Sequence, residues 1–98
     1  LGDVYKRQSA IIALDNVLID FPSYDNREEV HFLIVKSSYS LAINSISNKV
    51  EERLKSTLDA YSQFEDNYPK SEFLEDLKNT HNKTLQSLTE LKEKKNEI

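Results

Sequence analysis

A five-position pattern occurs twice in the chain, and the two copies are 47 residues apart, as Pro22 is from Pro69. Each copy reads small, large, large, aromatic, proline, with the first four side chains at the three- and four-residue spacing of one helix face. The copies are Ala10, Leu14, Val17, Phe21 and Pro22, and Thr57, Tyr61, Phe64, Tyr68 and Pro69. Because proline cannot continue a helix, the pattern predicts two related helices, each ended in the same way.

The period of the pattern selects among the known helical repeats. A small residue at a close helix crossing, bulky residues further along and a terminal proline are typical of a tetratricopeptide hairpin. That repeat usually has a period of about 34 residues, so the helices here must be longer than standard. HEAT and armadillo repeats, at roughly 40–47 residues, match the period better but not the aromatic–proline ending. A generic helical hairpin, with the pattern arising by chance, stays an alternative.

Composition supports a helical chain. The 98 residues allow one domain with a thin core, and one Gly and two Pro leave little material for β-turns. We therefore predict an all-α fold, a tetratricopeptide-like α-solenoid of three to four antiparallel helices. The net charge of −4, without a basic patch, argues against nucleic acid as a partner. The chain has no Cys and no apolar run of the roughly 20 residues that span a bilayer.

Apolar periodicity predicts the first two helices. Apolar residues recur at three and four over residues 10–21, and Pro22 ends that helix. Ser23 or Asp25 is expected to cap the next helix, which continues over residues 30–42. Apolar residues cover more than one side of this second helix, so it is expected to lie between neighbours.

Polar turns and the second proline set the limits of the last two helices. Asn and Ser at residues 44–48 predict a tight turn between the second helix and the third. The third helix is expected over residues 50–68, and Ser71 is expected to cap a last helix over residues 74–91. Residues 92–98 form a polar tail without an apolar face and are expected to fray.

The first eight residues are expected not to be native. The segment lacks a starting Met, and residues 3–8 read as the translation of a transposon-end adapter used in sequencing libraries. Residues 1–8 are therefore set aside as a scar that packs against nothing, and the helical repeats are assigned to residues 9–91. Deleting residues 1–8 is then expected to leave thermal stability unchanged.

No pattern of catalytic or metal-binding residues is recognisable. His31 and His81 fall on different helices without further ligands, so His81 is interpreted as a packing residue, and no metal or other cofactor is expected. The adjacent carboxylates at residues 28–29, 51–52 and 75–76 are interpreted as first-turn residues that stabilise helix N-termini. We expect a protein that is not an enzyme.

Several segments resemble the BamD-type lipoproteins of the outer-membrane assembly machinery. They are the stretch from Arg27 to Ser45, Glu52-Arg53-Leu54, Tyr61-Ser62-Gln63-Phe64 and Tyr68-Pro69-Lys70-Ser71. The resemblance covers about residues 10–88. It implies the C-terminal repeats of a periplasmic scaffold of Gram-negative bacteria, held at the inner face of the outer membrane by a lipid anchor that residues 1–98 lack. Expected upstream are a signal peptide, a lipidated Cys and further helical pairs that end in aromatic–proline.

The resemblance also implies the partner. C-terminal repeats of this family bind a periplasmic POTRA domain of the barrel subunit, alongside other members of the complex. Two rivals stay open: another bacterial tetratricopeptide scaffold, and a helical regulatory domain cut from an enzyme. From the polar sides of the two middle helices, the residues expected to contact a partner are Arg27, Glu28, Lys49, Glu52 and Arg53. Tyr61 and Phe64 are expected in the core.

Overall fold

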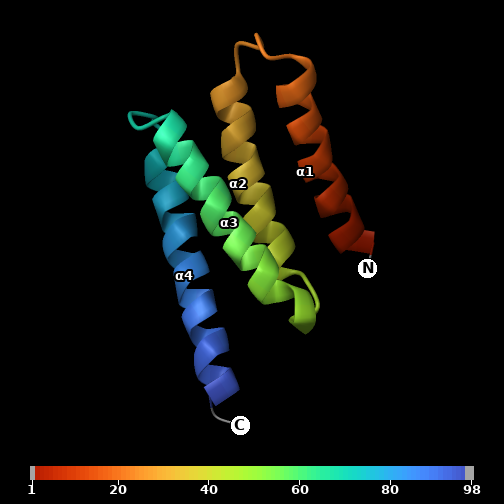
Figure 1. Ribbon diagram of the computed structural model, residues 1–98, viewed down its shortest axis with the longest axis vertical. Coiled ribbons are helices and arrows are strands. Elements are labelled where there is room, and N and C mark those ends of the chain that lie inside the picture. The colour runs from red at the N-terminus through yellow and green to blue at the C-terminus, as the bar shows by residue number, and fades with distance from the viewer. Residues whose placement is uncertain (1, 97–98) are drawn as a thin grey trace.

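The computed structural model describes residues 2–96, which form four helices (Figure 1). The helices are α1 (Gly2–Asp20), α2 (Arg27–Ile43), α3 (Ser47–Asn67) and α4 (Leu74–Asn96). Consecutive helices run antiparallel, and no strand occurs within residues 2–96. The principal extents are 50 × 31 × 16 Å, so the molecule is flat. The prediction of an all-α fold with antiparallel helices is confirmed.

The 47-residue sequence repeat is also a repeat of the helix boundaries. α1 ends at Asp20 and α3 at Asn67, while α2 begins at Arg27 and α4 at Leu74. Each of these two pairs of residues is separated by the same 47 positions as Pro22 and Pro69. The molecule is therefore built from two equivalent units, which we name the first pair (α1 and α2) and the second pair (α3 and α4).

The connections of the two pairs also share their backbone hydrogen bonds. Three hydrogen bonds of the first connection recur 47 residues later. In the first pair, Phe21 N–H donates to Val17 O (3.0 Å), Tyr24 N–H to Phe21 O (3.0 Å) and Val30 N–H to Asn26 O (3.1 Å). In the second pair, Tyr68 N–H donates to Phe64 O (2.8 Å), Ser71 N–H to Tyr68 O (3.1 Å) and Leu77 N–H to Phe73 O (3.0 Å). The aromatic residue and the proline thus end the helix and turn the chain in the same way twice.

The core lies where α2 packs against the second pair. Its central residues are Val35 of α2, Tyr61 and Phe64 of α3, and Leu77 of α4, and partly buried aromatic residues surround them. The predicted packing role of Tyr61 and Phe64 is confirmed. α2 lies between α1 and α3, as expected of a helix that is apolar on more than one side, whereas α1 contacts α2 alone and buries no residue fully.

Buried threonines mark the close packing of α3 and α4. Thr57, Thr80 and Thr84 are buried, although threonine is neither strongly apolar nor a good helix former. Each hydroxyl donates to the carbonyl four residues earlier, at 3.0, 3.5 and 2.7 Å, so no polar hydrogen is left without an acceptor. These short side chains let neighbouring helices approach, which is the part predicted for Thr57.

The structure corrects the expectation for the first residues. α1 begins at Gly2, so residues 2–8 continue the helix, and Val4 and Arg7 are half-buried. The Arg7 guanidinium donates to the Ser40 hydroxyl of α2, and the expectation that this segment packs against nothing is therefore wrong. Whether residues 2–8 are native stays a prediction, and Leu1 lies outside the described residues.

Four further expectations about helix ends are corrected. The residue at the N-cap of α2 is Asn26 rather than Ser23 or Asp25, and its side chain makes no capping bond. α3 begins at Ser47, inside the expected turn, so Glu51 and Glu52 lie beyond its first turn. Phe21 and Tyr68 were expected to be the last residues of the first and third helices, but α1 ends at Asp20 and α3 at Asn67, one residue earlier in each case.

The C-terminal helix is longer than expected. α4 continues to Asn96, because Lys95 pairs with Glu51 of α3 at 2.9 Å and ties the polar segment to its neighbour. The expected helix end at residue 91 is therefore wrong, whereas fraying of the polar tail stays a prediction, and residues 97–98 lie outside the described residues. The expected cap is present near the start of α4, where the Ser71 hydroxyl accepts a bond from Phe73 N–H at 3.0 Å.

Candidate protein-binding surfaces

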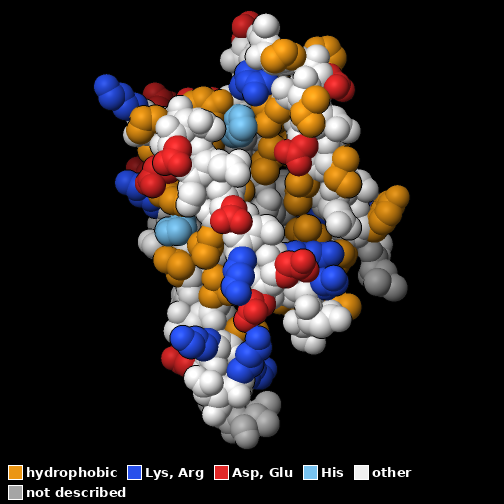
Figure 2. Space-filling model, in the orientation of Figure 1, with side chains coloured by type: hydrophobic (Ala, Val, Ile, Leu, Met, Phe, Trp, Pro, Cys, Tyr) orange, Lys and Arg blue, Asp and Glu red, His pale blue; other side chains and the backbone are white. Residues whose placement is uncertain are grey.

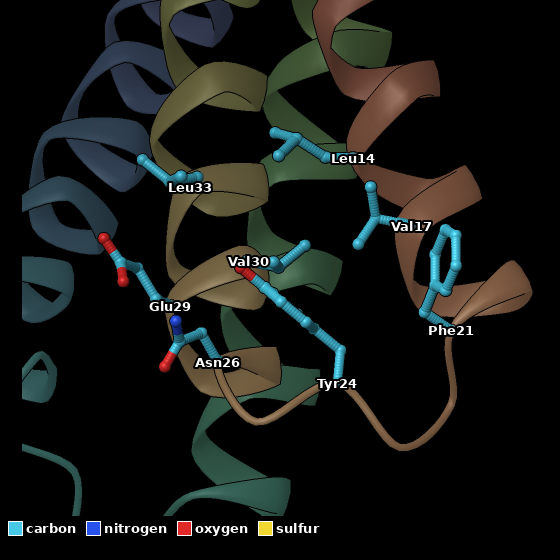
Figure 3. Close-up of a pocket in the computed structure, with 8 residues that line it drawn as sticks. All are labelled: Leu14, Val17, Phe21, Tyr24, Asn26, Glu29, Val30 and Leu33. Carbon is cyan, nitrogen blue, oxygen red and sulfur yellow. The ribbon is translucent and has the colours of Figure 1, made fainter.

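An apolar groove of about 610 Å³ lies between the two helices of the first pair (Figure 3). Leu14 and Val17 project into it from α1, and Val30 and Leu33 line it from α2. The complete lining is Leu14, Val17, Phe21, Tyr24, Asn26, Glu29, Val30 and Leu33. In the space-filling view, hydrophobic side chains gather over the ends of α1 and α2 that meet at this connection (Figure 2). The groove is an exposed apolar surface with one charged residue.

The large side chains of the groove are unusually accessible. Phe21 is 62% exposed and Tyr24 is 45% exposed, and Leu33 also keeps 40% of its surface in contact with solvent. Single exposed apolar residues are common on protein surfaces, but a contiguous set is typical of a binding site. The groove is therefore the strongest candidate for recognition of an apolar partner.

The equivalent groove of the second pair is filled by α2. Phe32 of α2 stacks on Phe73 with ring centroids 4.3 Å apart, and His31 lies against Tyr68 at 5.5 Å. Val35 is buried in the core between Phe64 and its neighbours. One face of α2 thus supplies the covering layer of the second pair.

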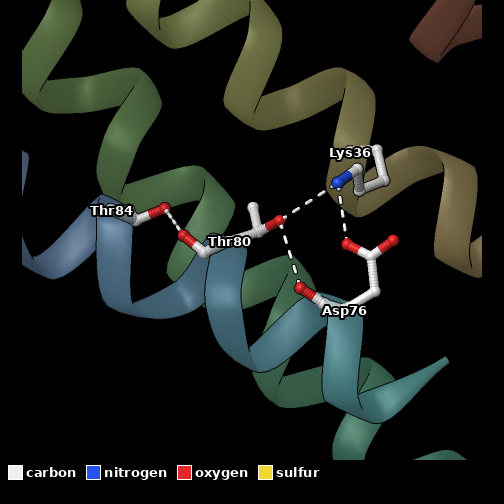
Figure 4. A network of polar contacts seen from close by, with 4 residues as sticks. All are labelled: Lys36, Asp76, Thr80 and Thr84. Atoms are coloured by element: carbon white, nitrogen blue, oxygen red, sulfur yellow. Dashed lines mark hydrogen bonds and ion pairs between the residues drawn. The ribbon is translucent and has the colours of Figure 1, made fainter.

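A polar contact fixes the edge of this covering layer (Figure 4). Lys36 Nζ donates to Asp76 Oδ1 at 2.8 Å and to the Thr80 hydroxyl at 3.4 Å. Both partners of the ion pair are about half exposed, so its contribution to stability is at most about 1 kcal/mol. The ion pair joins α2 to α4 beside the apolar contacts of Phe32 and Val35.

His31 lies between the two pairs. Burial holds the pKa of His31 below its usual 6.5, the nearby Arg27 lowers the pKa further, and Asp15 of α1 acts in the opposite direction. A lowered pKa favours the neutral imidazole, which suits a ring packed against Tyr68. His81 stacks on Tyr61 with ring centroids 4.3 Å apart, which confirms its predicted packing role.

The structure does not bring the five predicted partner-binding residues together. Arg27 and Glu28 lie at the start of α2, whereas Lys49, Glu52 and Arg53 lie near the start of α3, at the opposite end of α2. At 1.5 Å per residue the two groups are roughly 24 Å apart. Arg27 and Glu28 therefore lie far from the turn at residues 44–48 that connects the two helices, and contact of the five residues with a partner stays a prediction.

Arg27 and Arg53 have structural contacts of their own. Arg27 Nη1 donates to Leu18 O at 2.9 Å and to Phe21 O at 3.4 Å, which satisfies carbonyls at the end of α1. Arg53 Nη1 donates to the Ser45 hydroxyl at 2.5 Å and thereby holds the turn before α3. Both side chains are half-buried, so they are poorly placed to serve a partner alone.

Lys49, Glu52 and Arg53 share a second hollow, of about 430 Å³, that has a more polar lining. Gln8, Ile11 and Ile12 of α1 face them across it, together with residues of α2. Lys49 and Glu52 are exposed and approach each other to 3.7 Å. This end of the molecule keeps the predicted charged surface, reduced to three of its five residues.

The sequence pattern identifies three residues of the groove lining as members of one helix face, but it does not indicate that they are exposed. Leu14, Val17 and Phe21 follow the periodicity of a buried stripe, and periodicity does not tell a covered face from an open one. In the second copy of the pattern, by contrast, Phe64 and Tyr68 are packed against α2.

The carboxylates fit structural roles. Glu28, Glu29, Glu75 and Asp76 lie in the first turns of α2 and α4, as predicted. Glu51 accepts from Lys95, and this hydrogen bond holds the pKa of Glu51 below its usual value, with further contributions from the charges of Lys95 and Lys55.

Within residues 2–96, no group of three or more His, Cys, Asp or Glu side chains is arranged to hold a metal ion. The same part of the chain has no helix whose length and apolar content would let it cross a bilayer. Comparison of the chain with protein-family models, with curated proteins and with solved structures finds no match.

Proposed function

We propose that this chain is a non-catalytic scaffold that binds other proteins through stacked helical pairs. The observation that carries the proposal is the repetition of the helix ends and of the connection hydrogen bonds at an interval of 47 residues. Stacked pairs of this kind form tetratricopeptide-like solenoids, which offer extended surfaces rather than enclosed pockets. The flat 50 × 31 × 16 Å shape supports this interpretation.

Within this class, we favour a BamD-like part of the outer-membrane β-barrel assembly machinery. The support is the sequence resemblance over residues 10–88, above all the order and spacing of the resembling segments. Its partner is then a periplasmic POTRA domain of the barrel subunit, and its place is the periplasmic face of the outer membrane. Attachment to the membrane would come from a lipid anchor outside residues 1–98.

Co-purification tests the proposal. The chain of 98 residues is mixed with isolated POTRA domains of a barrel subunit and separated by size exclusion, and a stable complex is expected. Charge reversal of the exposed residues Lys49 and Glu52, one at a time, is expected to weaken it, because both side chains are accessible to a partner and contact each other only at 3.7 Å. Lys70→Glu, an exposed charge in the connection between α3 and α4, is the matched control. No complex with any POTRA domain would remove this assignment.

The two rivals are separated by the parent reading frame. A lipidated Cys after a signal peptide supports the BamD-like assignment. Further repeats without that Cys support another tetratricopeptide scaffold, and a catalytic domain upstream supports a regulatory part of an enzyme.

A further inference from the structure

The groove between α1 and α2 and the groove between α3 and α4 occupy equivalent positions in the two pairs. The first is open, and the second is filled by α2. Four residues of the groove lining have counterparts 47 positions later in the sequence. Leu14, Val17, Phe21 and Val30 correspond to Tyr61, Phe64, Tyr68 and Leu77. These four counterparts all belong to the hydrophobic core beneath α2. The structure therefore shows what covers such a groove when it is occupied: one helix, which runs parallel to the second helix of the pair.

The contacts of α2 define the chemistry that the groove accepts. α2 inserts an aromatic ring (Phe32), an aliphatic side chain three residues later (Val35) and a lysine at the next position (Lys36). Lys36 reaches Asp76, and the counterpart of Asp76 in the first pair is Glu29, which lines the open groove. The acceptor for a lysine is thus present and exposed.

A second copy of this chain has no matching helix free, because its own α2 is packed on α3 and α4. α4 is the counterpart of α2, but the positions equivalent to Phe32, Val35 and Lys36 are Asn79, Asn82 and Lys83, all exposed. Two asparagines in the apolar groove would lose their hydration without finding partners. Stacking of copies end to end is therefore disfavoured, and the occupant must be a different helix.

We propose that the groove between α1 and α2 binds an amphipathic helix of the α2 type, supplied by an adjoining helical repeat unit. The helix lies parallel to α2 and presents an aromatic residue, an aliphatic residue three positions later and then a lysine, which pairs with Glu29. This inference rests on the proposed repeat scaffold, and it concerns the end of the molecule opposite to Lys49 and Glu52.

A labelled peptide with the sequence of residues 27–43 is the probe, and fluorescence anisotropy with the chain of 98 residues is the readout. Saturable binding is expected. Leu33→Asp in the protein is expected to weaken binding at least about tenfold, because it places a charge in the apolar groove. The matched control is Ile19→Asp, an exposed isoleucine of α1 outside the groove lining. Circular dichroism shows whether each variant stays folded.

A charge exchange locates the bound peptide. Glu29→Lys is expected to weaken binding, and a peptide with Lys36→Glu is expected to restore it. Asp76→Asn is expected to change nothing, whereas a peptide that displaces the chain's own α2 would respond to Asp76 instead. Binding that ignores Leu33 and Glu29, or that follows Asp76, overturns the proposal, as does dimerisation of the chain through this groove in place of peptide binding. Because the POTRA test reads the opposite end, its failure and failure here are distinguishable.

Discussion

The two helix pairs have matching boundaries and connections but very different burial. At equivalent positions, Phe64 is fully buried and Val17 is half-buried, while Tyr68 is partly covered and Phe21 is 62% exposed. The local sequence pattern therefore determines where helices end and turn, whereas burial depends on the helix packed above. The second pair, which α2 covers, therefore indicates how the first pair would be buried if a helix packed against it.

The largest expected difference between the pairs is in the cost of removing a core side chain. Phe64→Ala is expected to destabilise the fold by about 3–5 kcal/mol, enough to unfold a domain of marginal stability. Val17→Ala, at the equivalent position, removes less volume from a site open to solvent and is expected to cost under about 1 kcal/mol. Urea denaturation followed by circular dichroism measures both. Equal losses would mean that the first pair is packed as tightly as the second.

A small-to-large pair of substitutions sharpens the comparison at a helix crossing. Thr84 is fully buried, so Thr84→Leu is expected to cost about 1–3 kcal/mol through overpacking. Its counterpart Ser37 lines an open hollow beside α1, so Ser37→Leu is expected to change stability by less than about 0.5 kcal/mol. Thermal melting of the two variants tests this, and tolerance of leucine at position 84 would contradict the close packing described for α4.

The ion pair of the covered unit is expected to have a smaller effect. Lys36→Ala should cost roughly 0.5 kcal/mol, because both Lys36 and Asp76 are about half exposed. Glu29→Ala removes the counterpart of Asp76, which has no ion-pair partner within residues 2–96, and should be neutral. The difference in stability loss between Lys36→Ala and Glu29→Ala is expected to shrink when the salt concentration is raised, since ions screen exposed charges. A salt-independent loss at Lys36 would show that its aliphatic stem, rather than its charge, is what matters.

Acidification is expected to have the smallest effect, and it acts through the residue between the pairs. The pKa of His31 is lowered in the folded state, so the folded chain binds fewer protons than the unfolded chain as the pH falls through about 6.5. The stability contributed by neutral His31 is thus fully present above that pH and is lost below it. His31→Gln should flatten this part of the stability profile, and Asp15→Asn should steepen it, because Asp15 raises the pKa. An unchanged profile in both variants would contradict the assignment.

The sequence predicted the helices because their signals are local. Pro22 and Pro69, with the aromatic residues before them, end α1 and α3 within one residue of the expected positions. The ends without such signals were missed. α3 starts inside the expected turn, and α4 extends to Asn96 because a distant residue, Glu51, holds Lys95. Contacts between helices cannot be read from a single periodicity.

The candidate surfaces were predicted less well, for the same reason. Arg27 reads as a polar surface residue, yet it caps the end of α1, and this depends on how the chain turns at residues 21–26. The sequence stripe through Leu14 and Val17 was found, but its exposure was not, because exposure depends on what lies above the stripe. The resemblance to BamD-type proteins concerns function and stays a prediction.

The thinness of the molecule has a consequence for how it opens. With a shortest extent of 16 Å and with α2 as the helix that packs closely against α1, detaching α1 leaves the packing among α2, α3 and α4 in place. Repeat proteins of this kind open unit by unit instead of all at once. Backbone amides of α1 should therefore exchange with deuterium well before those of α3 and α4. A helix bound in the groove would cover α1 from a second side and slow this exchange. Binding in the groove could therefore be measured as increased protection of the α1 amides.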